Sequence, residues 1–110
     1  MLVVSYANKC NKFKDNFEAS MKQYNFNYKI VWIGEKWINF IHRAKTVLDY
    51  IKTVDVPYII SIDCYDAFAC RNSSNIVEEF QNTNLDIIVS SEDNCLSPKN
   101  CHPIIKWPDK

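Results

Sequence analysis

Short apolar runs and amphipathic segments alternate along the chain. The apolar runs are rich in Val, Ile and Tyr and have the length of buried β-strands. Between them, apolar residues recur at intervals of three and four, which is typical of one face of a helix. The pattern predicts strands at residues 2–6, 28–33, 58–62 and 85–89, and helices that begin near Phe13, Ala44 and Ile76.

The third predicted helix also carries a start signal. Asn75 precedes the apolar residues Ile76, Val77 and Phe80, and Glu78 follows Asn75 by three positions, as in a capping box. The element order is therefore β-α-β-α-β-α-β. This order predicts an α/β fold with a mainly parallel sheet and helices on both faces. Residues 1–110 read as one domain without a linker or an internal repeat.

Composition and charge narrow the class of protein. The 110 residues are 47% hydrophobic and 24% charged, which is enough apolar material for a packed core. Thirteen basic residues balance thirteen acidic ones, so no basic excess points to nucleic acid. No apolar run approaches the roughly 18 residues that a membrane-spanning helix needs. We therefore expect neither a nucleic-acid partner nor a membrane span.

The N-terminal residues and the cysteines bear on the cellular compartment. Residues 1–6 have no charged leader and are too short for a signal-peptide core, so the chain as written is expected in the cytosol. The five cysteines are an odd number, which favours free thiols over a closed disulfide framework. The segment 72–74 is a glycosylation sequon that matters only in the secretory pathway. The sequence therefore does not decide the cellular compartment of the protein.

The most informative motif follows the third predicted strand. Asp63 and Asp66 come directly after the apolar run at 58–62. Because parallel sheets hold ligands at the carboxyl ends of their strands, two carboxylates there suit a divalent cation such as Mn²⁺ or Mg²⁺ that would hold a diphosphate. The alternative is that these aspartates only cap the following turn. A zinc site at Cys95, Cys101 and His102 is disfavoured, because no second ligand pair has the usual spacing.

Three separated motifs resemble a known family. They are Gly-Glu-Lys-Trp at 34–37, Asp-Cys-Tyr-Asp at 63–66, and Ser-Ser-Glu at 90–92 followed by Cys95 and Pro98. Together they are similar to the N-terminal glycosyltransferase domain of procollagen lysyl hydroxylases. The resemblance implies a GT-A-like (Rossmann-like) fold and transfer of glucose or galactose from a UDP-sugar to hydroxylysine of a collagen-like acceptor, with Mn²⁺ (or Mg²⁺). Relatives in this family act in the lumen of the endoplasmic reticulum.

The resemblance also implies roles for individual positions. Asp63 and Asp66 match the metal-binding aspartates, Tyr65 matches a uridine-contacting tyrosine, and Lys45 matches a lysine suited to approach the phosphates. Residues 6–8 match the segment that lines the nucleotide. The implied nucleotide-binding positions are Tyr6, Ala7, Asn8, Lys45, Asp63, Cys64 and Tyr65.

Departures from the family pattern leave the function open. The glycine-rich stretch before Lys45 is replaced by residues 39–44, which contain no glycine, and Leu96 stands where the family has a tryptophan. Neither His42 nor His102 matches the family's C-terminal metal-binding histidine. We therefore expect only the nucleotide-binding part of a truncated domain. The alternative is a non-catalytic, degenerate module that binds UDP or a protein partner. A receiver-like domain is disfavoured, because it needs acidic residues where Asn8 and Lys9 stand.

Overall fold

The sheet is built around β1 (Leu2–Tyr6), which pairs in parallel with β2 (Tyr28–Val31) on one side and β3 (Ile59–Ser61) on the other. The computed structural model describes residues 1–72 and 74–90. Val3 lies opposite Tyr28 in one pairing and opposite Ile60 in the other. All of β1 except Leu2 is buried, as expected of a central parallel strand. The parallel α/β prediction is confirmed.

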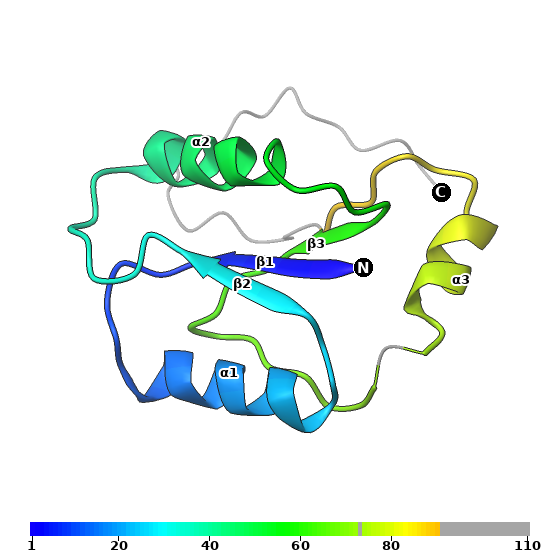
Figure 1. The fold of residues 1–110 in the computed structure, drawn as a ribbon, viewed down its shortest axis with the longest axis horizontal. Helices are drawn as coiled ribbons and strands as arrows, with labels where there is room; N and C mark the ends of the chain where they lie inside the picture. Colours follow the sequence, from blue (N-terminus) through cyan, green and yellow to red (C-terminus); the bar gives the residue numbers. More distant parts are fainter. Residues whose placement is uncertain (73, 91–110) are drawn as a thin grey trace, which may run out of the picture.

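Helices α1 (Lys12–Gln23) and α2 (Phe40–Ile51) cover opposite faces of this sheet (Figure 1). Both begin at an asparagine in extended backbone whose side chain accepts hydrogen bonds from the first turn: Asn11 for α1 and Asn39 for α2. The cap at Asn39 starts α2 four residues before Ala44, where the spacing predicts its start. As a result the first turn of α2 includes Arg43.

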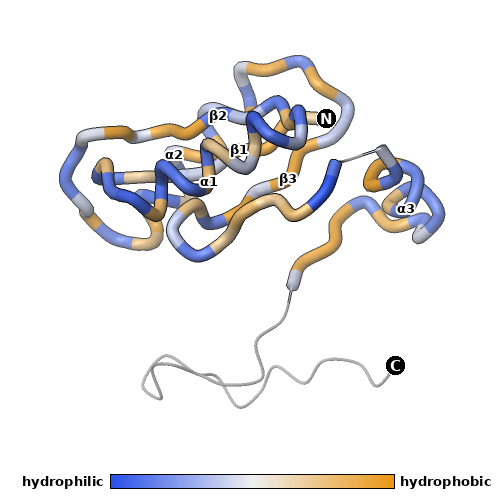
Figure 2. Tube along the Cα trace, turned by 90° about the horizontal axis from the view of Figure 1, so that it is seen from below, coloured by the Kyte–Doolittle hydropathy of each residue, from blue (hydrophilic) through white to orange (hydrophobic). Residues whose placement is uncertain are grey.

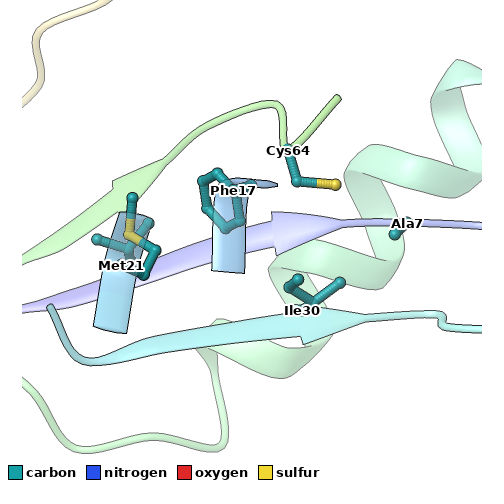
Figure 3. Close-up of a cluster of buried hydrophobic side chains, with 6 residues drawn as sticks. Ala7, Phe17, Met21, Ile30 and Cys64 are labelled. Atoms are coloured by element: carbon teal, nitrogen blue, oxygen red, sulfur yellow. The ribbon is translucent and has the colours of Figure 1, made fainter. Parts of the chain in front are cut away.

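The best-packed part of the core lies between α1 and the sheet. Phe17 and Met21 of α1 pack with Ile30 of β2, and Ala7 and Cys64 extend this cluster toward the carboxyl ends of the strands (Figure 3). By contrast, α2 has no buried residue, although it covers the other face of β1. The two helices therefore contribute unequally to the core.

Helix α3 (Ile76–Asn82) lies near the start of β1 and β3 (Figure 1), where the Phe80 ring meets Tyr58 edge to face at 6.0 Å. The capping-box prediction is wrong here. Asn75 has helical backbone angles (φ −111°, ψ −3°), and its side chain makes no capping hydrogen bond. An N-cap side chain reaches the first turn from extended backbone, which Asn75 does not adopt.

The predicted fourth strand is also wrong. Residues 85–89 are irregular, and Figure 2 shows them as a hydrophobic stretch after α3. Ile87 is 76% exposed, and a cavity lined by Ile59, Ile60, Ile87 and Ile88 separates the segment from β3. A run of β-branched residues reports side-chain preference, whereas a strand also needs a neighbour to take its backbone hydrogen bonds. Among the described residues, β3 is left as an edge of the sheet.

No helix among the described residues is both long and apolar enough to cross a membrane.

Candidate functional site

The residues predicted to bind a nucleotide gather at the carboxyl edge of the sheet. Tyr6 ends β1, Ala7 and Asn8 follow it, and residues 63–66 follow β3, its neighbour in the sheet. Residue 7 continues the pairing with β2, because its amide donates to the Val31 carbonyl at 3.0 Å. This is the edge at which open α/β sheets hold their ligands.

Tyr65 ties the two loops of this edge together. Its hydroxyl oxygen accepts from the amides of Asn8 at 2.9 Å and Lys9 at 3.1 Å. The same hydroxyl lies 3.1 Å from Asn8 Oδ1, to which it can donate. The predicted pair Asn8 and Tyr65 is thus brought into direct contact. In this arrangement the phenol fixes the loop after β1, and its ring packs against the hydrophobic core.

Ala7 and Cys64 lie beneath the surface of the site. Both side chains are fully buried, and the Cys64 thiol contacts the Tyr6 carbonyl oxygen at 3.4 Å. Burial raises the pKa of the Cys64 thiol. These two residues shape the floor of the site, and their side chains do not reach its surface.

Asp63 uses its two carboxylate oxygens for different partners. Oδ1 accepts from the Tyr65 amide at 2.9 Å, which is the turn-capping role considered as the alternative to metal binding. Oδ2 lies 3.5 Å from Nη2 of Arg43, in the first turn of α2. Asp66 is exposed and makes no ion pair within the described residues.

Arg43 was missed by the sequence reasoning, which placed Lys45 at this point instead. Lys45 is exposed and follows Arg43 by two positions, which turns it about 200° around the helix axis. The two side chains therefore leave α2 in nearly opposite directions, and Arg43 is the one that meets Asp63. The missed signal was Asn39, whose capping role moves the helix start and brings Arg43 to the carboxyl edge of the sheet.

Aromatic rings line the other side of this edge. The ring of Tyr6 stacks on Trp32 at 6.5 Å and meets Trp37 and His42 edge to face at 6.0 and 6.4 Å. Trp32 and His42 are 4.3 Å apart, and Phe40 adjoins Trp37 at 5.1 Å. We call these five residues the aromatic wall. The sequence analysis did not foresee this cluster.

Two polar atoms of the aromatic wall are buried without a partner among the described residues. They are the Tyr6 hydroxyl oxygen and Nδ1 of His42. Burial, followed by the charge on Tyr65, raises the pKa of the Tyr6 hydroxyl. Trp32 has a positive φ of 67°, which is costly for a bulky side chain. Unpaired buried polar groups and backbone strain are common where a ligand binds.

The comparison with known proteins identifies the family. A family model described as the PLOD GT domain matches residues 1–108, nearly the whole chain. The chain belongs to this family. It is 23% identical over 121 residues to procollagen-lysine,2-oxoglutarate 5-dioxygenase 2 of Homo sapiens and 22% identical to the protein of the same name from Mus musculus. The alignments cover 100% of this chain and 15% of each relative.

Membership of the PLOD GT family confirms the resemblance drawn from the three motifs. It establishes a glycosyltransferase-like domain with an α/β fold. The first two motifs lie within the described residues: Gly34 adopts φ +83° in the loop that carries Trp37, and residues 63–66 follow β3. The third motif begins at Ser90, the last described residue, and the rest of it, with Cys95 and Pro98, lies outside the described residues, as do the three residues of the disfavoured zinc site.

The predicted metal ligands do not by themselves fit a metal centre. Asp63 and Asp66 are donors of the right kind for Mn²⁺ or Mg²⁺. Within residues 1–72 and 74–90, however, no three His, Cys, Asp or Glu side chains are grouped closely enough to hold a metal ion. Asp63 is in addition already paired with a guanidinium. A cation held by Asp63 would lie next to Arg43 and would need ligands besides Asp63 and Asp66.

Proposed function

We propose that this PLOD GT-like domain binds a UDP-sugar at the carboxyl edge of its sheet. The observation that carries the proposal is the meeting of the loops after β1 and β3, joined by the Tyr65 hydroxyl and bordered by the aromatic wall. Planar rings suit a nucleobase, and Arg43 suits a diphosphate. Asn8 and Tyr65 would then contact the nucleoside, over the floor made by Ala7 and Cys64. Tyr6 is only 3% exposed and would contact the nucleoside only if the aromatic wall rearranges.

The same proposal extends to the reaction. The domain would transfer glucose or galactose from UDP to hydroxylysine of a collagen-like acceptor, in keeping with the relatives named as procollagen-lysine dioxygenases. The chain spans only 15% of those relatives, so this activity is proposed for a protein in which the acceptor side is complete. Mn²⁺ or Mg²⁺ at Asp63 and Asp66, and a phosphate contact from Lys45, stay predictions.

A second candidate is a non-catalytic module that binds UDP or a protein partner. The observation that favours it is the ion pair between Arg43 and Asp63, which engages a proposed metal ligand in a contact within the chain. Residues 39–44 favour it as well, because bulky side chains stand where the family has glycine, which allows a phosphate to approach the backbone closely.

An assay of UDP release separates the two candidates. The 110-residue chain is incubated with UDP-glucose or UDP-galactose, with and without a peptide that contains hydroxylysine. We expect UDP-sugar binding but no turnover that depends on acceptor, because transfer needs an acceptor held in line with the sugar. Robust acceptor-dependent release would discard the non-catalytic candidate. Binding is measured in parallel by isothermal titration calorimetry with UDP-glucose and UDP-galactose, and its absence for both donors would refute the UDP-sugar proposal.

A further inference from the structure

A positive charge already stands where a divalent cation would be expected. The Arg43 guanidinium lies 3.5 Å from Asp63 Oδ2 and links the first turn of α2 to the loop after β3. Both side chains are about one-third exposed, at 32% and 37%. The Tyr65 amide holds the other oxygen of Asp63 at 2.9 Å, so the carboxylate presents Oδ2 to the guanidinium.

We infer that Arg43 is the resident cation of Asp63 and that a divalent cation competes with it for this carboxylate. The inference rests on the proposed function in one respect: both assume that the ligand site lies at this edge of the sheet. A guanidinium is always charged, and a metal ion cannot share Oδ2 with it without bringing two positive charges together. Arg43 therefore weakens metal binding at Asp63.

The geometry of α2 makes the competition specific to one residue. Lys45 carries the same charge but leaves the helix in nearly the opposite direction from Arg43. If only net charge mattered, Arg43 and Lys45 would weaken metal binding equally. Direct pairing with the Asp63 carboxylate involves only Arg43. Asp66, which is exposed, has no such competitor among the described residues.

The place of Arg43 has a consequence for anions. Without a divalent cation the guanidinium stays at the carboxyl edge of the sheet, where its N–H groups not used by Asp63 can donate hydrogen bonds to a phosphate. The positive charge that a diphosphate needs is then supplied by the chain itself. Binding of UDP is therefore expected to persist when divalent cations are removed by a chelator.

The test is a titration of the full chain with Mn²⁺, in which free Mn²⁺ is measured by its electron paramagnetic resonance signal. Arg43→Gln removes the resident cation and should tighten Mn²⁺ binding by about threefold to tenfold, the range expected for removing one partly exposed opposite charge. Arg43→Lys keeps a cation and should stay close to the wild type. Lys45→Gln removes the same charge from the other side of α2 and should change the affinity by less than about twofold.

Several results would overturn the inference. Equal Mn²⁺ affinities for the wild type and Arg43→Gln, or no measurable binding in either, would show that Arg43 does not compete for Asp63. An equal gain in Lys45→Gln would reduce the effect to net charge. Thermal melts of each variant confirm that it is folded. UDP is left out of these titrations and added in a second series, once with Mn²⁺ and once with chelator. Failure of UDP binding under both conditions would refute the proposed function and would leave the Mn²⁺ competition at Asp63 unaffected.

Discussion

At the scale of single residues, the site depends on groups whose chemistry is set by burial and by close partners. Tyr65 was foreseen as a site residue, but its contacts with the loop after β1 depend on how two strands far apart in sequence come together. The role of Arg43 in the site could have been predicted from the sequence if Asn39 had been recognised as the N-cap of α2. The aromatic wall could not have been predicted, because it joins three separate segments of the chain.

Replacement of Tyr65 by Phe tests its role in holding the loop after β1. The variant leaves the amides of Asn8 and Lys9 without their acceptor, so we expect it to lose about 1 kcal/mol of stability and to bind UDP more weakly. Urea unfolding measures the first effect. Tyr24→Phe is the control, because the Tyr24 hydroxyl makes no hydrogen bond within the described residues. Equal losses in both variants would contradict the assigned role.

The partly buried pair of Lys14 and Glu18 gives a pH-dependent prediction. Their hydrogen bond of 2.8 Å lowers the pKa of Glu18 below its usual 4.5 and raises that of Lys14. Because the folded pKa of Glu18 is lowered, its contribution is present above the unfolded pKa and is lost as the pH falls through the folded value. Glu18→Gln should cost about 1–2 kcal/mol at pH 7 and much less at pH 3. A cost that stays constant with pH would refute the assignment.

Cys64 is expected to be chemically silent in the folded protein. Its thiol is fully buried with a raised pKa, whereas Cys10 and Cys70 are exposed. Iodoacetamide should therefore modify Cys10 and Cys70 under native conditions and Cys64 only in denaturant, as mapped by mass spectrometry of peptides. Rapid native modification of Cys64 would show that the floor of the site is open.

At the scale of elements, the sequence pattern predicted the existence and type of three strands and three helices, and it failed where an element needs a distant partner. The residues at 85–89 have the composition of a strand, but they pair with no strand in the part of the chain that the structure describes. Conversely, α2 has a clear apolar face, yet none of its residues is buried. Periodicity shows which side chains share a face, and it does not show how tightly that face is covered.

The unequal burial of α1 and α2 predicts unequal costs of truncation. Phe17 of α1 is fully buried, whereas Leu48 of α2 is 50% exposed. Phe17→Ala should destabilise the protein by about 3–5 kcal/mol, because it removes a large side chain from a packed core. Leu48→Ala should cost less than about 1 kcal/mol, in line with the surface position of its side chain. Chemical denaturation compares the two, and similar losses would contradict the described packing.

At the scale of the whole molecule, the three-stranded parallel sheet of the described residues brings the ends of β1 and β3 and the start of α2 to one edge. We propose that a uridine nucleotide binds at that edge. The family supports a glycosyltransferase-like domain. The parallel pairing of the strands could be inferred from their alternation with helices, whereas their order in the sheet, β2-β1-β3, could not. The identity of the nucleotide depends on side-chain positions that no sequence pattern specifies.

The most direct test compares thermal melts of the chain with UDP, ADP and GDP. A ligand at 100 times its dissociation constant stabilises a folded protein by about 2.7 kcal/mol, which gives a clear rise in Tm. The account predicts a rise with UDP that is markedly larger than with ADP or GDP, and that falls in Arg43→Gln when a chelator is present. Equal rises for all three nucleotides, or none for any, would contradict the claim that this edge of the sheet is a uridine nucleotide site.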